Sequence, residues 1–339
     1  MTTIALDVMG GDHAPAAALS AAAHYSQQEG CPNLLLVGDA AIIASTLATL
    51  PHDPRRLRIE HAGQVVGMDV DPKTALDVAP DASIAVAARL VADGHADALV
   101  SAGNTGAVVL ACARTWRRLP GVPRAALGAV YPTERRHGER QDPFSLILDA
   151  GLTLEVDAAA LEAFAVMGSA YAARISRNKR PSVALLSNGH EASKGPDAVV
   201  EAHARLRSRS DLNFVGNIEG TDIPRGTVDV VVTGGFVGNI VLKMLEGVAE
   251  TMQTLMRSAA DASLINKAGL ALLMPALTEL KRTTDWQQYG GAPILGFDRV
   301  CIKAHGRSSP RAIKNAIKVA ARACESDLVE AIRLGLLSP

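Results

Sequence analysis

The feature that most constrains the fold is a short apolar strand that runs directly into a glycine turn near the start of the chain. The strand is predicted at Ile4–Val8, and an alanine-rich helix follows the turn. The turn itself carries Gly10, Gly11, Asp12 and His13. In open α/β sheets, ligands bind at the carboxyl ends of strands, and the bare N–H groups of a helix N-terminus favour anions. Taken alone, the segment fits a ligand site and a polar surface turn equally well.

Apolar strand-like segments alternate with helical segments along the rest of the chain. Further strands are predicted at residues 33–37, 57–61, 96–100, 144–148, 182–186, 213–215, 228–232 and 299–302, and helices at 40–50, 83–93, 107–118 and in the gaps between the later strands. Strands as continuously apolar as Val228–Val232 are typical of a parallel sheet covered on both faces. Repeated βα units predict a doubly wound, Rossmann-like α/β/α sandwich, with residues 1–339 as a single catalytic domain.

Residues 244–282 interrupt this alternation with two apolar helical runs. Apolar side chains recur at helical spacing from Leu245 to Met256, and a second run extends from Leu264 to Leu277. Pro275 is expected to bend or end the second helix. The pattern predicts a protruding helical pair that packs in a homodimer interface. An apolar tip that touches a membrane surface is the alternative, and both functions are compatible on different faces.

Composition narrows the class of partner and the compartment. The 339 residues hold 34 basic and 35 acidic side chains and only 3% aromatics, so no nucleic-acid partner is expected. The four cysteines lie far apart without a CxxC pair, which argues against zinc and against a disulfide framework. The first residues lack a leader pattern, and no apolar stretch approaches the roughly 20 residues of a membrane span. We expect a cytoplasmic protein, with peripheral contact at the inner face of the cell membrane left open.

A second strand-to-helix turn resembles the first. It contains Ser101, Gly103, Asn104, Thr105 and Gly106. Such a turn can present several N–H groups and small polar side chains to a phosphate. It lacks the G-K-[ST] ending of a Walker A motif, and an ordinary βα turn remains the simpler interpretation of this segment alone.

Two more glycine turns follow in the second half. One precedes a helix on which Asn239 and Lys243 lie one turn apart on the same face. Lys243 also fits a solvated helix lysine.

The other turn contains Gly290 and Gly291 and leads to a strand that ends near Lys303 and His305. Because alternate residues of a strand point the same way, these two side chains are predicted to face one anion together.

Several enzyme classes lack support in the sequence. The GxGxxG fingerprint of dinucleotide-binding proteins is absent, as are the HExxH and GxSxG motifs of zinc and serine hydrolases. Glycine turns at several strand ends instead indicate a phosphate-bearing ligand. No cofactor and no metal are expected.

Taken together, these segments resemble one family, the bacterial phosphate acyltransferases (PlsX) of phospholipid synthesis. The resemblance runs from Ile4 to about Ile317. It depends on the strings LDVMGGDH (6–13), SAGNTGA (101–107), VMGSAYA (166–172), GNIEG (216–220), GFVGN (235–239), YGGAP (289–293) and IKAHG (302–306).

The resemblance implies a fold similar to phosphate acetyltransferases and isocitrate dehydrogenases, formed as a homodimer. It implies that an acyl-carrier-protein (acyl-ACP) thioester and inorganic phosphate react to give acyl phosphate and free carrier protein. The product would feed a membrane glycerol-3-phosphate acyltransferase.

Phosphate is already a competent oxygen nucleophile, so the chemistry requires positioning and oxyanion stabilisation rather than a nucleophilic side chain. We expect Lys303 and the N–H groups of residues 101–106 to hold phosphate. His13 or His305 would donate to the oxyanion or the departing thiolate, and Asp12 would orient a histidine or the turn.

The chain departs from the family pattern at Ala79-Pro80, at Gly151-Leu152-Thr153 and at Gly234, where the family usually has a lysine pair, Gly-Ala-Asn and an aspartate. Two alternatives therefore stay open. One is a divergent relative that binds acyl phosphate or carrier protein with weak or no turnover. The other is an NAD- and metal-dependent decarboxylating dehydrogenase, which is disfavoured because no cluster of metal-binding aspartates facing arginines is found.

Overall fold

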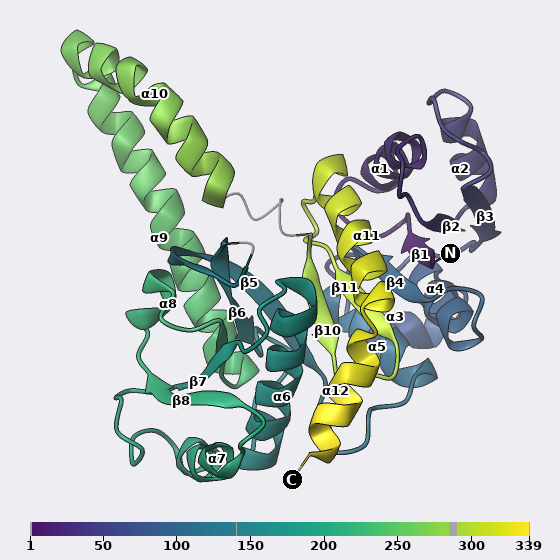
Figure 1. Cartoon of the computed structure of the whole chain (residues 1–339). Coiled ribbons are helices and arrows are strands. Elements are labelled where there is room, and N and C mark those ends of the chain that lie inside the picture. The colour runs from purple at the N-terminus through teal and green to yellow at the C-terminus, as the bar shows by residue number, and fades with distance from the viewer. Residues whose placement is uncertain (1, 140, 285–289, 339) are drawn as a thin grey trace.

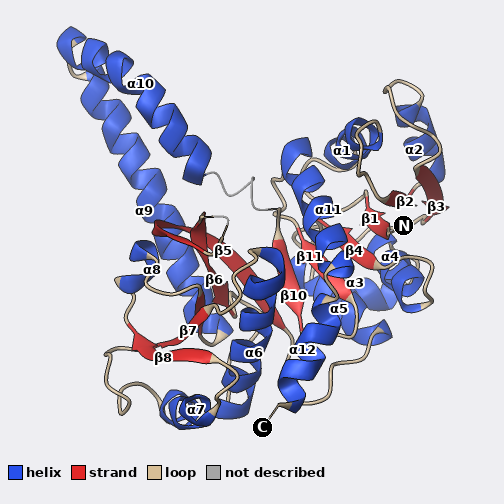
Figure 2. Cartoon of the chain, viewed as in Figure 1, coloured by secondary structure: helices blue, strands red, loops and turns tan. Residues whose placement is uncertain are grey.

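The computed structural model describes residues 2–139, 141–284 and 290–338, in which eleven strands form one sheet flanked by helices (Figures 1 and 2). The strands are β1 (Thr3–Asp7), β2 (Asn33–Gly38), β3 (Leu57–His61), β4 (Ala98–Ser101), β5 (Ala126–His137), β6 (Asp142–Leu148), β7 (Ser182–Leu186), β8 (Asn213–Ile218), β9 (Val230–Val232), β10 (Ala292–Leu295) and β11 (Val300–Lys303). The helices are α1 (Ala16–Ser26), α2 (Ala40–Leu47), α3 (Pro72–Val78), α4 (Ser83–Ala92), α5 (Thr105–Thr115), α6 (Ala158–Ile175), α7 (Asp197–Ser208), α8 (Asp222–Arg225), α9 (Gly235–Asp261), α10 (Leu264–Thr284), α11 (Pro310–Glu325) and α12 (Leu328–Leu337).

The sheet has two parallel halves that run in opposite directions. Its strand order is β3-β2-β1-β4-β11-β10-β5-β6-β9-β7-β8. The first five strands are mutually parallel, and so are the last four. Between them, β10 is antiparallel to β11 and to β5, and β5 is antiparallel to β6. The doubly wound α/β prediction is confirmed, with parallel pairing within each half and antiparallel pairing at the centre.

Strand alternation builds the core on both faces of the sheet. In β1, Ile4 and Leu6 join a cluster formed with α1, α6, α11 and α12, whereas Ala5 joins a cluster formed with α4 and α5. In β6, Leu148 lies in the first cluster and Ile147 in a third one, which includes side chains of α8 and α9. Two buried faces explain why the strands read as near-continuous apolar runs.

Each half contains one topological switch point, where neighbouring strands are followed by connections that leave in opposite directions. In the first half the chain moves outward from β1 to β2 and β3, then returns to β4 on the other side of β1. In the second half it leaves β6 for β7, and it later leaves β9 for β10 on the far side of β6. Ligands bind at such points in open α/β sheets, so the β1/β4 and β6/β9 crevices are the two places to examine.

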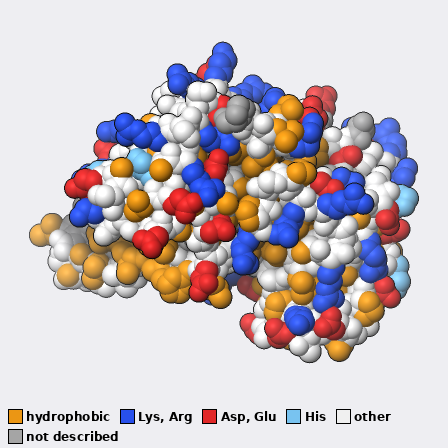
Figure 3. Space-filling model, turned by 90° about the horizontal axis from the view of Figure 1, so that it is seen from below, with side chains coloured by type: hydrophobic (Ala, Val, Ile, Leu, Met, Phe, Trp, Pro, Cys, Tyr) orange, Lys and Arg blue, Asp and Glu red, His pale blue; other side chains and the backbone are white. Residues whose placement is uncertain are grey.

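Helices α9 and α10 pack on each other and project from the body as an arm (Figure 1). This confirms the predicted helical pair, and α10 continues through Pro275 to Thr284. Exposed apolar side chains gather on the arm, at the left of Figure 3. In the part of the chain that the structure describes, no helix combines the length and the apolar character needed to cross a bilayer.

The sequence pattern does not predict two of the strands, β5 and β10. β5 mixes Thr, Glu and Arg with apolar residues and contains a proline, and β10 is only four residues long and follows a glycine turn. β5 thus lacks a continuous apolar signal, and in β10 Pro293, which has no backbone N–H, argues against a strand although the segment is apolar. The expectation of a single domain stays a prediction.

Candidate functional site

Three glycine turns meet at the β1/β4 switch point, as the sequence predicts. The N–H of Asp12 donates to the carbonyl of Gly306 at 2.9 Å, which joins the first turn to the segment after β11. A Cβ atom on Gly10 would lie 2.7 Å from the backbone nitrogen of Gly103, so the first and second turns touch through glycines. Gly11 has a φ of +108° and faces Ala102. Three segments far apart in the sequence thus form one surface.

Lys303 supplies a buried cation at this place. Its side chain is 6% exposed, and its Nζ donates to the carbonyl oxygens of Ala102, at 3.4 Å, and of Ala304. An ammonium has three N–H donors and two of them have acceptors among the described residues, which leaves one for a ligand. Burial lowers the pKa of Lys303 to about 8, while Cys301, Asp7 and Asp12 raise it. At neutral pH the group is a cation held in a place that favours an anionic partner.

Asp7, at the end of β1, is a site residue that the sequence reasoning missed. It is 2% exposed, and its Oδ2 accepts a hydrogen bond from the Ser101 hydroxyl at 2.6 Å. Ser101 Oγ in turn accepts the N–H of Gly103 at 3.0 Å. The structure thereby corrects one expectation, because the single proton of the Ser101 hydroxyl points to Asp7 and not to a ligand. A charged residue at the end of an otherwise apolar strand was the signal that could have identified Asp7.

Asn104 shapes the second turn instead of lining a ligand site. Its Oδ1 accepts the N–H of Ala107 at 3.1 Å and caps α5, and its Nδ2 donates to the carbonyl of Met68 at 2.8 Å. The N–H groups of Thr105 and Gly106 open the first turn of α5 and have no acceptor among the residues that the structure describes. Such free N–H groups at the start of an eleven-residue helix form an anion-binding end.

The candidate acid–base residues surround this surface. Asp12 and His13 are exposed in the turn before α1. His305 is also exposed over part of its surface, and burial of the rest of its ring, with Lys303 and Lys243 nearby, lowers its pKa. Strand alternation does not place Lys303 and His305 on one face, because β11 ends at Lys303; the lysine is buried, whereas the nearby His305 is exposed.

Gly290 and Gly291 support the site from behind. Their φ angles are +79° and +88°. A Cβ on Gly291 would lie 2.8 Å from the carbonyl oxygen of Lys303, and one on Gly290 would lie 2.5 Å from that of Asn315. These glycines allow close packing against β11 and α11, so their role in direct ligand binding stays a prediction.

The two predicted residues of α9 lie in different surroundings. Asn239 lies next to Gly151 at the β6/β9 crevice, where a Cβ on the glycine would be 3.5 Å from the Asn239 Cβ. Lys243 is exposed, pairs with Glu246 at 2.8 Å, and acts electrostatically on His305. The structure therefore brings Lys243, but not Asn239, toward the first crevice.

The β6/β9 crevice is filled by the chain's own carboxylate. Asp149 is fully buried and accepts the N–H groups of Leu127, Gly151, Leu152 and Thr153 at 2.8–3.1 Å. The Thr153 hydroxyl also donates to Asp149, at 2.9 Å, and accepts the N–H of the first α9 residue at 2.9 Å. The chain's own carboxylate thus satisfies the N–H groups of the turn that follows β6.

The departures from the family pattern lie outside the first crevice. Thr153 belongs to the Asp149 network, and Gly234 is the N-cap residue of α9. Ala79 and Pro80 link α3 to α4, where the Pro80 carbonyl accepts a hydrogen bond from Arg89 at 2.7 Å. None of them alters a contact among the three glycine turns described above.

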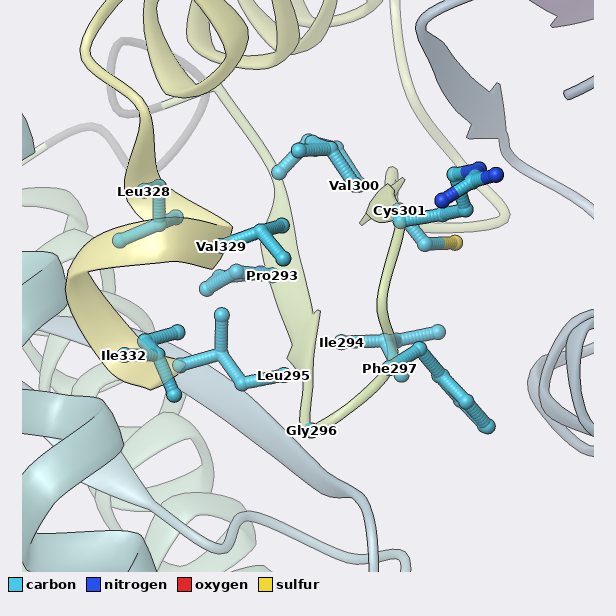
Figure 4. Close-up of a pocket in the computed structure, with 12 residues that line it drawn as sticks. Pro293, Ile294, Leu295, Gly296, Phe297, Val300, Cys301, Leu328, Val329 and Ile332 are labelled. Atoms are coloured by element: carbon cyan, nitrogen blue, oxygen red, sulfur yellow. The ribbon is translucent and has the colours of Figure 1, made fainter. Parts of the chain in front are cut away.

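A separate hollow between β10, β11 and α12 does not have the character of a reaction site (Figure 4). Leu295 of β10 and Leu328 and Ile332 of α12 gather around it in that view. Its lining is mostly apolar, so it is a packing gap under α12. In the described residues, no group of three or more His, Cys, Asp or Glu side chains is arranged to hold a metal ion.

Comparison with solved structures supports the fold. The EutD phosphotransacetylase of Staphylococcus aureus superposes with a TM-score of 0.63 at 16% identity, covering 95% of this chain and 94% of that one. A phosphotransacetylase of Streptococcus pyogenes gives a TM-score of 0.63 at 17% identity, covering 96% and 94%. The expected likeness to phosphate acetyltransferases is confirmed at the level of fold.

Comparison with protein families and curated relatives identifies the family. A family model described as "Fatty acid synthesis protein" matches residues 2–331. The phosphate acyltransferase of Myxococcus xanthus is 46% identical over 94% of this chain and 88% of its own length. That of Elusimicrobium minutum is 41% identical over 97% and 94%. With matches of this identity along nearly its whole length, the chain belongs to the phosphate acyltransferase family.

Proposed function

We propose that this chain transfers an acyl group from an acyl-ACP thioester to inorganic phosphate, as a step of phospholipid synthesis. A phosphate oxygen forms a bond to the thioester carbonyl carbon, the C–S bond breaks, and the departing thiolate takes a proton. The products are acyl phosphate and free carrier protein. Membership of the phosphate acyltransferase family supports the reaction.

The observation that carries the proposal is the meeting of three glycine turns around buried Lys303. The remaining Lys303 donor and the N–H groups of Thr105 and Gly106 hold the phosphate. A dianion fixed against the carbonyl carbon gains most of its rate from orientation and from electrostatic stabilisation.

The proton donor is the less constrained part of the proposal. Partial burial, together with nearby Lys303, lowers the pKa of His305, and His13 lies in the exposed turn that leads to α1. Either histidine donates to the carbonyl oxygen or to the thiolate, and the carboxylate of Asp12 orients the first turn.

The test is phosphate-dependent release of free thiol from acyl-ACP, followed with a thiol reagent over several acyl lengths. Release that saturates with phosphate supports the proposal. Binding of the acyl carrier without release would instead identify a relative that has lost turnover. If His13→Ala and His305→Ala both stay within a few-fold of the parent, the acid assignment is wrong.

We further propose that the arm mediates assembly and membrane contact. Leu264 and Ile265 at its tip are 84% and 83% exposed, and Leu272 is 84% exposed. Pairing of two arms buries such side chains in a homodimer, and an apolar tip left free inserts shallowly into a lipid surface. Contact at the inner face of the membrane brings acyl phosphate to a membrane glycerol-3-phosphate acyltransferase.

Sedimentation and vesicle flotation separate these two uses of the arm. Leu264→Glu with Ile265→Glu should abolish flotation on anionic vesicles and leave the dimer intact if the tip alone meets lipid. A monomer in sedimentation of the parent chain would refute the dimer, and unchanged flotation of the double variant would refute the membrane tip.

A further inference from the structure

Asp7 is a buried charge that the proposed reaction does not use directly. It lies at the end of β1, immediately beneath the two turns that form the crevice, and is 2% exposed. Burying a carboxylate costs free energy unless hydrogen bonds or an opposite charge compensate. The groups that offset the cost of burying the Asp7 charge therefore indicate the role of this residue.

Hydrogen bonds tie Asp7 to both sides of the switch point. The bond from Ser101 links β1 to β4 across 94 residues of sequence, and the Ser101 hydroxyl oxygen also accepts the N–H of Gly103. The N–H of Met9 donates to the other carboxylate oxygen at 3.3 Å. Gly10 fits only because it has no side chain, since a Cβ there would lie 2.6 Å from Asp7 Oδ2. One carboxylate thus fixes the backbone of both turns.

The second compensation is electrostatic. Burial raises the pKa of Asp7, and hydrogen bonds from Ser101 and Ser83 lower it. Burial lowers the pKa of Lys303, whereas Cys301 of β11, Asp7 of β1 and Asp12 of the turn after β1 raise it. His305, after β11, also interacts electrostatically with Lys303. Of the two carboxylates, Asp7 is buried and Asp12 is exposed, so water screens Asp7 less.

We propose that Asp7 is a positioning residue of the phosphate site, which holds the two turns in register through Ser101 and keeps Lys303 in its cationic form. The proposal rests on the proposed function, because it takes the turns and Lys303 as the phosphate-binding groups. Asp7 touches no substrate. The two effects are tested by different variants, since Ser101→Ala breaks the link between the turns and leaves the Asp7 carboxylate in place.

The experiment compares kcat/KM for phosphate against pH in the full-length enzyme and in three variants. Asp7→Asn keeps an oxygen that accepts from Ser101 but removes the charge. Ser101→Ala keeps the charge and breaks the link between the turns. Asp149→Asn is the matched control, since it neutralises a carboxylate that is equally buried in the other crevice. Thermal unfolding of each variant reports its folding.

The expected results differ in kind. Asp7→Asn moves the alkaline fall of kcat/KM downward by roughly half to one pH unit, because an opposite charge near Lys303 has been lost. Ser101→Ala lowers kcat/KM by roughly 10- to 100-fold, mainly through KM for phosphate, and leaves the alkaline fall where it was. Asp149→Asn leaves the alkaline fall unmoved. A purely structural role for Asp7 would lower stability without moving the pH profile.

Two outcomes overturn the inference. The first is that folded Asp7→Asn loses kcat/KM at the same alkaline pH as the parent. The second is that Ser101→Ala has parent-like kcat/KM, and this result overturns the inference even if Asp7→Asn does not fold. Lys303→Met separates this failure from that of the proposed function. If Lys303→Met retains parent-like phosphate saturation, the phosphate site itself is misplaced. If Lys303→Met loses phosphate saturation while the Asp7 and Ser101 variants behave as the parent, only the present inference fails.

Discussion

The two switch points of the sheet are built from the same elements but hold residues of opposite charge. At each, strands end in glycine turns and a helix begins. The β1/β4 crevice offers the N–H groups of Thr105 and Gly106 beside a buried lysine. In the β6/β9 crevice, Asp149 accepts the N–H groups of the turn after β6, and the Thr153 hydroxyl accepts the first N–H of α9. A glycine turn before a helix therefore indicates where an anion is held, but not whether that anion is a substrate or the protein's own carboxylate.

The electrostatics of the two crevices explain the difference. An internal carboxylate bound by several N–H groups stabilises a turn permanently and needs no ligand. A lysine at the crevice with one donor left is stabilised further only when an external anion arrives. The first arrangement stabilises the folded chain, and the second is suited to bind an external anion. Four variants and conditions test this contrast, from the largest expected effect to the smallest.

The largest effect is expected from removing the cation of the first crevice. Lys303→Met should lower kcat/KM for phosphate by roughly 100- to 1000-fold, the usual cost of losing one electrostatic donor in a transition state. Steady-state kinetics with phosphate as the varied substrate measure it. Lys243→Met is the matched control, since Lys243 is an exposed lysine paired with Glu246. Equal losses in both variants would show that Lys303 has no special position.

In the second crevice, the expected effect is on stability. Asp149→Ala leaves several buried N–H groups without an acceptor and should lower the free energy of unfolding by about 3 kcal/mol. KM for phosphate should remain near that of the parent. Urea unfolding and kinetics measure the two quantities. A rise in KM without a loss of stability would mean that this crevice, too, binds substrate.

The contact between the first two turns is tested by one methyl group. In Gly10→Ala the new Cβ would lie 2.6 Å from Asp7 Oδ2 and 2.7 Å from the Gly103 nitrogen. Because one neighbour is backbone, relief requires the turns to separate, at a cost of about 2 kcal/mol. Gly220→Ala serves as the control, since nothing lies within 4 Å of its Cβ position. Equal melting temperatures for the two variants would contradict the close approach.

The smallest effect is expected from pH alone. The pKa of Lys303 is lowered to about 8 in the folded chain, so the cation is present below that pH and lost above it. We expect kcat/KM for phosphate to fall about tenfold per pH unit above pH 8, and Lys303→Arg to hold its activity to higher pH. Stability moves the other way: the unfolded chain keeps this proton to higher pH, so the lysine's destabilising effect is relieved as pH rises above 8. A flat profile to pH 10 would refute the assignment.

Much of the first crevice was predictable from the sequence, because parallel strands bring their carboxyl ends to one edge. That rule places Gly10, Ser101 and Lys303 together without knowledge of any contact. It could not show that the Ser101 hydroxyl points to Asp7, since this depends on the spacing of two strands 94 residues apart in sequence. Asp7 was therefore missed, and Ser101 was given the wrong role.

The β6/β9 crevice shows more clearly what sequence patterns cannot predict. Thr153 and Gly234 stand out only as departures from a family pattern. The Thr153 hydroxyl accepts the N–H of Gly235, the neighbour of Gly234, across 82 residues. Asp149 fills the turn that directly follows it, and only the bond from the Leu127 N–H comes from another strand. The reversal of strand direction at β10 and β5 was not predicted because β5 is mixed in polarity and both strands contain a proline, which argues against a strand.

Arsenate is close to phosphate in shape and charge, and its anomalous scattering locates it directly. A crystal of the full chain soaked in arsenate should show one anomalous peak within hydrogen-bond distance of the Thr105 and Gly106 nitrogens and of Lys303 Nζ. The β6/β9 crevice should show none, because Asp149 repels a second anion. A peak at the N-terminus of α9, or none at the start of α5, would contradict the account.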